Sequence, residues 1–242
     1  MLPQRAPWSS FPPVSILALQ SKVDAHPDYP AAFAGYSAAA ANLVSSFFDP
    51  SHLPVGPGST DFVVPVLRSG SNHDIVSTLA AVTATFLGAR VCSKVQEITQ
   101  FKPSPEFTLQ RLVNQPVFSG TPPTGRCLIV SDHVSLGSGI ANLRGFLSHH
   151  GCIVSSACAL TADFAAADIV PSPNTIQATR KRFELEKSLL VSVFGFEPEY
   201  LTSREAMFLY SLPSLKLLLE PSQHFKMTLE SADGLKRLKK VY

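Results

Sequence analysis

The feature that most limits the fold of this chain is an alternation of short apolar runs with segments of helical periodicity. In the segment 72–88, for example, Ile75, Leu79 and Val82 recur at the spacing of one helix face. Strand, helix and strand repeated in this order build a parallel sheet with helices packed on its faces. We therefore predict an α/β fold. The expected strands are 62–67, 89–98, 126–130 and 152–161, and the expected helices between them are 72–88 and 139–151.

Segments of different composition flank this alternating pattern and divide the chain into three parts. Residues 1–60 are rich in proline and predict one helix between Pro30 and Pro50, so we expect a helical extension that could form a hood over a site. Residues 61–171 contain the alternating strands and helices. Residues 172–242 predict a helical C-terminal segment.

Helix starts are marked clearly in the C-terminal segment. Ser172 before Pro173 is typical of an N-cap followed by the first helical residue. Thr202 followed three residues later by Glu205 is typical of a capping box. We expect helices to begin at both places.

The composition fits a folded protein with a sizeable core, because 45% of the residues are hydrophobic and only 16% are charged. The formal net charge of +2 is too small to indicate nucleic-acid binding by itself. Basic residues gather near the C-terminus, where they fit a solvated helix end or a contact with a partner or nucleic acid: Lys236, Arg237, Lys239 and Lys240.

Cysteine usage and hydropathy predict the compartment. Four cysteines without a C-x-x-C pair favour a reducing, cytoplasmic location. The N-terminal sequence lacks the layout of a signal peptide. The longest apolar-leaning stretch, 31–48, is dominated by alanine and serine, which predicts a packed helix rather than a membrane span. We expect a cytoplasmic protein without a membrane partner.

A glycine- and serine-rich loop, 131–139 (SDHVSLGSG), joins the third expected strand to its helix. Backbone N–H groups at a helix start have no partner inside the helix and bind phosphate well, and the glycines would let an anion approach them. Ser135 and Ser138 could add hydroxyl donors. Asp132, at the strand end, would suit sugar hydroxyls or a Mg²⁺ ion on the same ligand.

A second turn suited to phosphate follows the first expected strand, at Arg68, Ser69 and Gly70. The arginine guanidinium offers a rigid fork of donors that matches phosphate or pyrophosphate. Because the carboxyl ends of parallel strands meet at one edge of the sheet, this turn and the loop 131–139 are expected to share that edge, where ligands bind in such sheets.

Other interpretations of the loop 131–139 fit less well. A dinucleotide site would place G-x-G-x-x-G directly after the strand, and a Walker A loop would need G-K-[ST]. A Ser-His-Asp site built on His133 and Asp132 is disfavoured, since neighbouring residues on a strand point to opposite faces. The simplest alternative, a tight turn without a ligand, stays open.

The segment 127–151 (CLIVSDHVSLGSGIANLRGFLSHHG) resembles the signature of the type I phosphoribosyltransferase superfamily: an apolar strand, acids, apolar residues and a Gly/Ser-rich loop that opens a helix. The segment 63–91 is similar to the first strand, pyrophosphate loop and helix of that family, and the insertion 99–125 stands where the family carries its flexible catalytic loop. The resemblance covers residues 61–161 and implies a divergent member.

The resemblance implies a site for phosphoribosyl pyrophosphate (PRPP). Its 5′-phosphate would lie on backbone N–H groups of Ser135, Leu136, Gly137, Ser138 and Gly139. Its ribose hydroxyls would meet Asp132, next to Ser131, and Asp132 would also be a catalytic residue and an indirect ligand of Mg²⁺. The pyrophosphate would lie with Mg²⁺ against Arg68, Ser69, Gly70 and Lys94. Lys102, in the insertion, would act catalytically on the leaving group.

The chain departs from the family pattern at three positions: Ser131 replaces the first of two acids, Leu136 a threonine and Gly139 a closing Thr or Ser. Losing one carboxylate removes charge that would stabilise a cationic sugar. Two hypotheses follow. The first is a phosphoribosyltransferase that transfers ribose-5-phosphate from PRPP to an unidentified nitrogenous acceptor and releases pyrophosphate. The second is a non-catalytic ligand-binding or regulatory module. Homodimers are common in this superfamily, so a homodimer is compatible with either.

Overall fold

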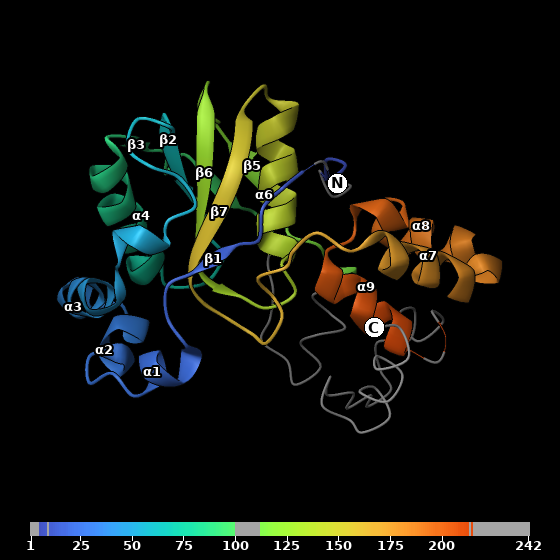
Figure 1. The fold of residues 1–242 in the computed structure, drawn as a ribbon, viewed down its shortest axis with the longest axis horizontal. Helices are drawn as coiled ribbons and strands as arrows, with labels where there is room; N and C mark the ends of the chain where they lie inside the picture. Colours follow the sequence, from blue (N-terminus) through green and yellow to red (C-terminus); the bar gives the residue numbers. More distant parts are fainter. Residues whose placement is uncertain (1–4, 9, 100–111, 213, 215–242) are drawn as a thin grey trace.

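The computed structural model describes residues 5–8, 10–99, 112–212 and 214 (Figure 1). Its centre is a five-stranded parallel sheet in the order β1-β7-β6-β2-β3. The strands are β1 (Ser15–Ile16), β2 (Phe62–Pro65), β3 (Arg90–Val91), β6 (Arg126–Val134) and β7 (Ile153–Ala162). The α/β prediction is confirmed, with a fifth strand that the sequence pattern had not indicated.

Helices cover both faces of the sheet because alternate strand residues are apolar on each side. On one face, Val63 and Leu128 pack against α3 (Ser37–Phe47) and α4 (Asp74–Leu87). On the other, Val64 and Ile129 pack against α6 (Ser138–His149). Figure 1 shows α4 and α6 on opposite sides of β2, β6 and β7. The two long expected helices are therefore present and sandwich the sheet.

The N-terminal segment is more broken than the single expected helix. It contains β1, α1 (Gln20–Asp24), α2 (Tyr29–Ala34), α3 and a 3₁₀ turn, η1 (Pro50–His52). Helix α2 ends at Gly35, whose φ of 98° is left-handed, and α3 starts two residues later. The prediction of one continuous helix was wrong because Gly35 stops the first part. The strand β1 pairs in parallel with β7, so this segment belongs to the main sheet.

The second expected strand, 89–98, is split in two. Only β3 joins the main sheet, while β4 (Val95–Glu97) pairs antiparallel with β5 (Phe118–Gly120) beyond the long insertion. A Cβ at Gly120 would overlap the Lys94 carbonyl, so only glycine permits this close pairing. Pairing with β5 therefore takes residues 95–97 away from β3 and towards the carboxyl edge of the main sheet.

The described part of the C-terminal segment, residues 172–212, is helical, as expected. It contains α7 (Pro173–Arg182), η2 (Glu184–Glu186), α8 (Lys187–Phe194), η3 (Pro198–Tyr200) and α9 (Ser203–Ser211). The Ser172 cap and the Thr202–Glu205 capping box are both present. These elements enclose a small core of their own that includes Phe183, Phe194 and Phe208.

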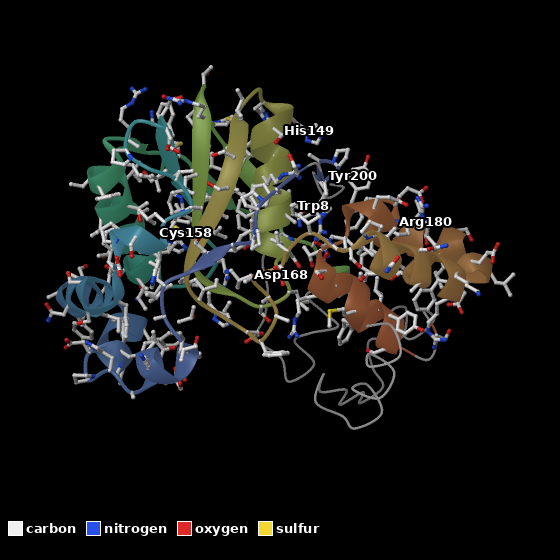
Figure 2. The ribbon with its side chains drawn as sticks, in the orientation of Figure 1. Trp8, His149, Cys158, Asp168, Arg180 and Tyr200 are labelled. Carbon is white, nitrogen blue, oxygen red and sulfur yellow. The ribbon has the colours of Figure 1, made fainter. Side chains whose placement is uncertain are left out.

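The N-terminal end of the chain ties this C-terminal segment to the sheet. Trp8 lies beside α6 and the C-terminal helices (Figure 2), where its indole Nε1 donates to the Leu201 carbonyl at 2.7 Å and its ring faces the Arg144 guanidinium at 4.6 Å. Within the described ranges, no helix has the length and apolar character needed to cross a membrane. The basic C-terminal residues lie outside the described residues.

Candidate ligand site at the carboxyl edge of the sheet

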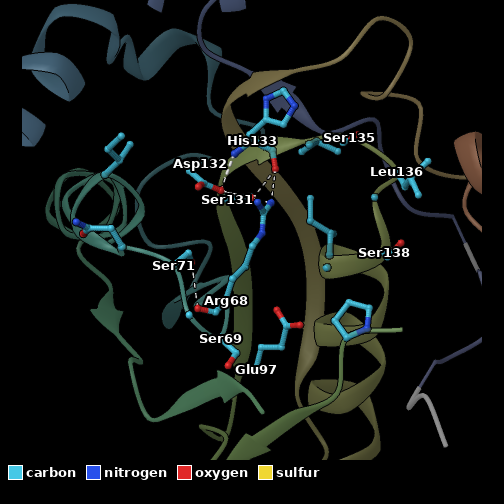
Figure 3. Close-up of a pocket in the computed structure, with 18 of the residues that line it drawn as sticks. Arg68, Ser69, Ser71, Glu97, Ser131, Asp132, His133, Ser135, Leu136 and Ser138 are labelled. Atoms are coloured by element: carbon cyan, nitrogen blue, oxygen red, sulfur yellow. Dashed lines mark hydrogen bonds and ion pairs between the residues drawn. The ribbon is translucent and has the colours of Figure 1, made fainter. Parts of the chain in front are cut away.

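A cavity of about 460 Å³ opens at the carboxyl edge of the sheet (Figure 3). The turn after β2 and the loop after β6 form its walls, which is the shared edge that the sequence predicts. Among the residues that line it are ten of the predicted site residues: Arg68, Ser69, Gly70, Ser131, Asp132, Ser135, Leu136, Gly137, Ser138 and Gly139.

The loop after β6 presents free backbone donors to this cavity. Gly137 is the N-cap of α6 with a φ of 81°, and no side chain caps the helix. The hydrogen bonds of the described residues do not use the N–H groups of Ser138, Gly139 and Ile140. A Cβ at Gly137 would lie 3.1 Å from Ile169 Cδ1, so the outer side of the loop is tightly packed. The arrangement suits an anion.

The side chain of Ser138 points away from this anion position. Its hydroxyl donates to Oε1 of Glu205 at 2.6 Å, and both residues are buried. Full burial acts to raise the pKa of the Glu205 carboxyl, but the Arg5 charge and the hydrogen bonds from Arg5, Ser138 and Thr202 outweigh burial and hold the pKa below its ordinary value. Glu205 is therefore ionised at neutral pH, and Ser138 offers the cavity its N–H group rather than its hydroxyl.

Asp132 and Arg68 form an ion pair in the cavity wall. An Arg68 Nη lies 3.5 Å from Asp132 Oδ1 and donates to the His133 carbonyl at 2.7 Å. Asp132 Oδ1 also accepts from the His133 backbone N–H at 2.8 Å. Both side chains keep some exposure, 23% for Arg68 and 33% for Asp132, so a ligand can reach them.

Ser131 is turned into the strand. The residue is 1% exposed, and its hydroxyl donates to the His133 carbonyl at 3.0 Å and to Asp132 Oδ1 at 3.3 Å. It therefore supports the orientation of Asp132 and supplies no charge to the cavity.

The Arg68 turn is held by its own polar groups. Gly70 has a φ of 71°, and the Arg68 carbonyl accepts from Ser71 Oγ at 3.0 Å and from His73 Nε2 at 2.6 Å. This turn runs into α4, so the position of Arg68 is coupled to a long, packed helix. A guanidinium held in this way can bind the oxygens of a second anionic group.

The His133 ring is bonded to residues on and after β7 rather than to Asp132. Its ring is hydrogen bonded through Nδ1 to Thr161 Oγ1 at 2.8 Å, and its Nε2 lies 3.2 Å from Asp163 Oδ1. Both partners lie on or directly after β7, on the far side from Arg68. The geometry agrees with the expectation that neighbouring strand residues point apart.

Two residues of interest line the cavity that the sequence analysis had not named, Glu97 and Phe33. Glu97 lies on β4 and is 8% exposed, and Figure 3 shows its carboxylate between Arg68 and α6. Phe33 lies on α2 and is 68% exposed. On a strand, Glu97 lies on the same side as the apolar Val95, so the period of two could have pointed to an inward Glu97, but no sequence signal places α2 at the cavity.

Of the two predicted lysines, the structure describes only Lys94. Lys94 lies exposed between β3 and β4 and does not line the cavity. Lys102 lies outside the described residues. In the part of the chain that the structure describes, no group of three or more His, Cys, Asp or Glu side chains could hold a metal ion.

Comparison with known proteins gives a curated relative. No protein-family model matches the chain. It is 28% identical over 221 residues to Protein TraN of Escherichia coli, across 88% of this chain and 49% of that protein. The chain thus spans about half the length of the curated relative that it matches.

Similar solved structures include two phosphoribosyltransferases. One is an orotate phosphoribosyltransferase from Aeropyrum pernix, with 22% identity, a TM-score of 0.31, and coverage of 46% of this chain and 52% of that chain. The other is an adenine phosphoribosyltransferase, with 10% identity, a TM-score of 0.33, and coverage of 59% and 74%. Likenesses this weak do not assign a function to the chain.

Proposed function

We propose that this protein binds PRPP in the cavity and transfers its ribose-5-phosphate to a nitrogenous acceptor, with release of pyrophosphate. One observation carries the proposal: a loop with free N–H donors, a carboxylate and a guanidinium line one cavity at the carboxyl edge of a parallel sheet. A phosphate, a sugar diol and a pyrophosphate need these three kinds of group, in that order along the ligand.

The roles of the residues follow from their chemistry. The N–H groups of Ser138, Gly139 and Ile140 would hold the 5′-phosphate at the start of α6. Asp132 would accept from the ribose hydroxyls and stabilise positive charge on the sugar in the transition state. Arg68 would leave Asp132 and bind the pyrophosphate, which carries the departing negative charge.

A Mg²⁺ ion fits this site only together with PRPP. Mg²⁺ is commonly bound through one or two carboxylates, water and substrate phosphates rather than by a cage of protein ligands. Asp132 would face such an ion indirectly, and Glu97 offers a second carboxylate in the same cavity. Magnesium would neutralise the pyrophosphate as it leaves.

The acceptor would enter beside α2. Phe33 lines the cavity and is exposed, so its ring is available to stack on a planar base. The aromatic residues of the C-terminal segment are different, because Phe183, Phe194, Phe196 and Phe208 are buried in its core. The N-terminal segment is therefore the better candidate for the hood.

The test is pyrophosphate release from PRPP with Mg²⁺ and a panel of nitrogenous bases. Asp132→Asn should lower release by about a hundredfold or more, because it removes the only charged group proposed to face the ribose. Asp168→Asn is the matched control, since Asp168 is exposed and lies outside the cavity lining. Equal loss in both variants would contradict the role of Asp132.

A second function, binding of PRPP without turnover, is favoured by the geometry of Ser131. Its buried hydroxyl is bonded within the strand, so nothing at position 131 replaces the lost carboxylate. Protection against thermal unfolding by PRPP without pyrophosphate release, across the panel of bases, would support this module. Absence of any protection by PRPP would contradict both functions.

A further inference from the structure

A buried ion pair joins the N-terminal and C-terminal parts of the described chain beside the proposed anion-binding loop, residues 135–140. Arg5 is 5% exposed and Glu205 is 0% exposed, and two Arg5 Nη atoms donate to the two Glu205 carboxylate oxygens at 2.6 Å each. Gln115 joins the same network, since its Oε1 accepts from Arg5 at 2.6 Å and from Asn142 Nδ2 at 2.9 Å. Arg5 and Gln115, which lies just before β5, therefore meet α6 and α9 in one network centred on the Glu205 carboxylate.

The network reaches the loop at two points. Glu205 accepts from the Ser138 hydroxyl, the first residue of α6, at 2.6 Å. Thr202, whose backbone N–H donates to Glu205 at 2.9 Å, uses its hydroxyl to donate to the Leu136 carbonyl at 2.5 Å. The first turn of α9 thus binds the loop on both sides of Gly137.

Stability alone is a weak reason for such a pair. Removing two charges from water is costly, and well-packed apolar residues of similar volume often stabilise a protein as well as a buried ion pair. A buried, fully bonded carboxylate does fix the positions of its donors. Here the donors include the loop whose N–H groups face the cavity.

We propose that Glu205 is a positioning residue for the anion-binding loop. Acting through Ser138 and Thr202, it sets the direction in which the N–H groups of residues 138–140 face the cavity. The choice of PRPP as the ligand rests on the proposed function, whereas the effect of Glu205 on the loop does not.

Three variants test the proposal: Glu205→Gln, Ser138→Ala and Phe194→Leu. Glu205→Gln removes the charge and Ser138→Ala removes only the contact with the loop. Phe194→Leu is the control, because Phe194 is fully buried in the core of the C-terminal segment and does not line the cavity. Hydrogen exchange of the amides of residues 136–140 and the affinity for PRPP with Mg²⁺ are measured well below each unfolding midpoint.

We expect Glu205→Gln and Ser138→Ala each to speed exchange at the loop amides and to weaken PRPP affinity by about tenfold, the equivalent of one net hydrogen bond. The double variant should lose less than the product of the single losses, because Glu205 acts partly through Ser138. Phe194→Leu should lower the unfolding midpoint and leave both readouts unchanged.

The outcomes separate this inference from the proposed function. Unchanged loop exchange in Glu205→Gln, or equal change in Phe194→Leu, would overturn the positioning role. Faster loop exchange without PRPP binding by the wild-type protein would support the positioning role and contradict the function. Strong PRPP binding that is equal in all variants would support the function and overturn the positioning role.

Discussion

Asp132 and Arg68 show how much of the site depends on single residues and on their immediate neighbours. Asp132 is held by the His133 N–H and the Ser131 hydroxyl, and Arg68 donates to the His133 carbonyl. Their types and positions at strand ends could be predicted from the sequence. The distance of 3.5 Å between Arg68 and Asp132 could not be predicted, because it depends on the register between β2 and β6.

Glu97 carries a prediction at the same scale. Its carboxylate lines the cavity near Arg68, so it supplies a second negative charge to the cavity that holds Asp132. We expect Glu97→Gln to lower the rate of pyrophosphate release from PRPP by about tenfold while the protein stays folded. Gln96→Ala is the control, since Gln96 is the exposed neighbour on β4. Equal rates for Glu97→Gln and the wild-type protein would contradict a role of Glu97 in the reaction.

At the scale of elements, local signals and pairing decide different things. The helices α4 and α6 follow from periodicity, and α9 follows from its capping box. The division of 89–98 into β3 and β4 does not follow from local signals. The two parts form one extended run in the sequence, and they differ only in the strands with which they pair. The same holds for β1, whose two residues become a strand by pairing with β7.

We expect the position of α2 to depend on Gly35. It ends α2 with a φ of 98°, and a Cβ there would overlap the Asn72 side chain beside the Arg68 turn. Gly35→Ala should destabilise the protein by about 1–3 kcal/mol, measured by urea unfolding. It should also weaken acceptor binding, because α2 carries Phe33. Gly56→Ala is the control, since its φ is ordinary and nothing lies within 4 Å of a Cβ there; similar losses in both would contradict this explanation.

At the scale of the whole molecule, the Arg5–Glu205 pair connects the N-terminal end, α6 and the C-terminal segment. Its partners are 200 positions apart in the sequence. The capping box predicted Glu205 as a local helix signal, and the structure keeps that role. The same carboxylate is also the centre of a long-range network, which no local pattern encodes.

The Arg5–Glu205 pair predicts how the free energy of unfolding depends on pH. Because the folded state holds the pKa of Glu205 below its ordinary value, the pair stabilises the fold above the unfolded pKa of about 4.3, and this contribution is lost as the pH falls through the folded pKa. Arg5→Met should cost about 3–5 kcal/mol at pH 7, because it leaves a buried carboxylate without its charge partner.

Urea unfolding of the wild-type protein and Arg5→Met between pH 3 and pH 7 measures this effect. The difference between the two should narrow as the medium becomes acidic, since protonation removes the charge that Arg5 balances. A difference that stays constant from pH 7 to pH 3 would show that Arg5 stabilises the fold by packing alone, for instance through its contact with the Phe196 ring.

The sequence by itself determined the alternation that makes a parallel sheet, the helix starts, and the two turns whose groups suit phosphate. These are properties of neighbouring residues, set by side-chain periodicity and by backbone groups at helix ends. Only the tertiary structure decided that α2 and β4 reach the cavity and that the Ser138 hydroxyl is bound by Glu205. Such contacts form between distant segments, and burial makes them favourable only when every polar partner is in place.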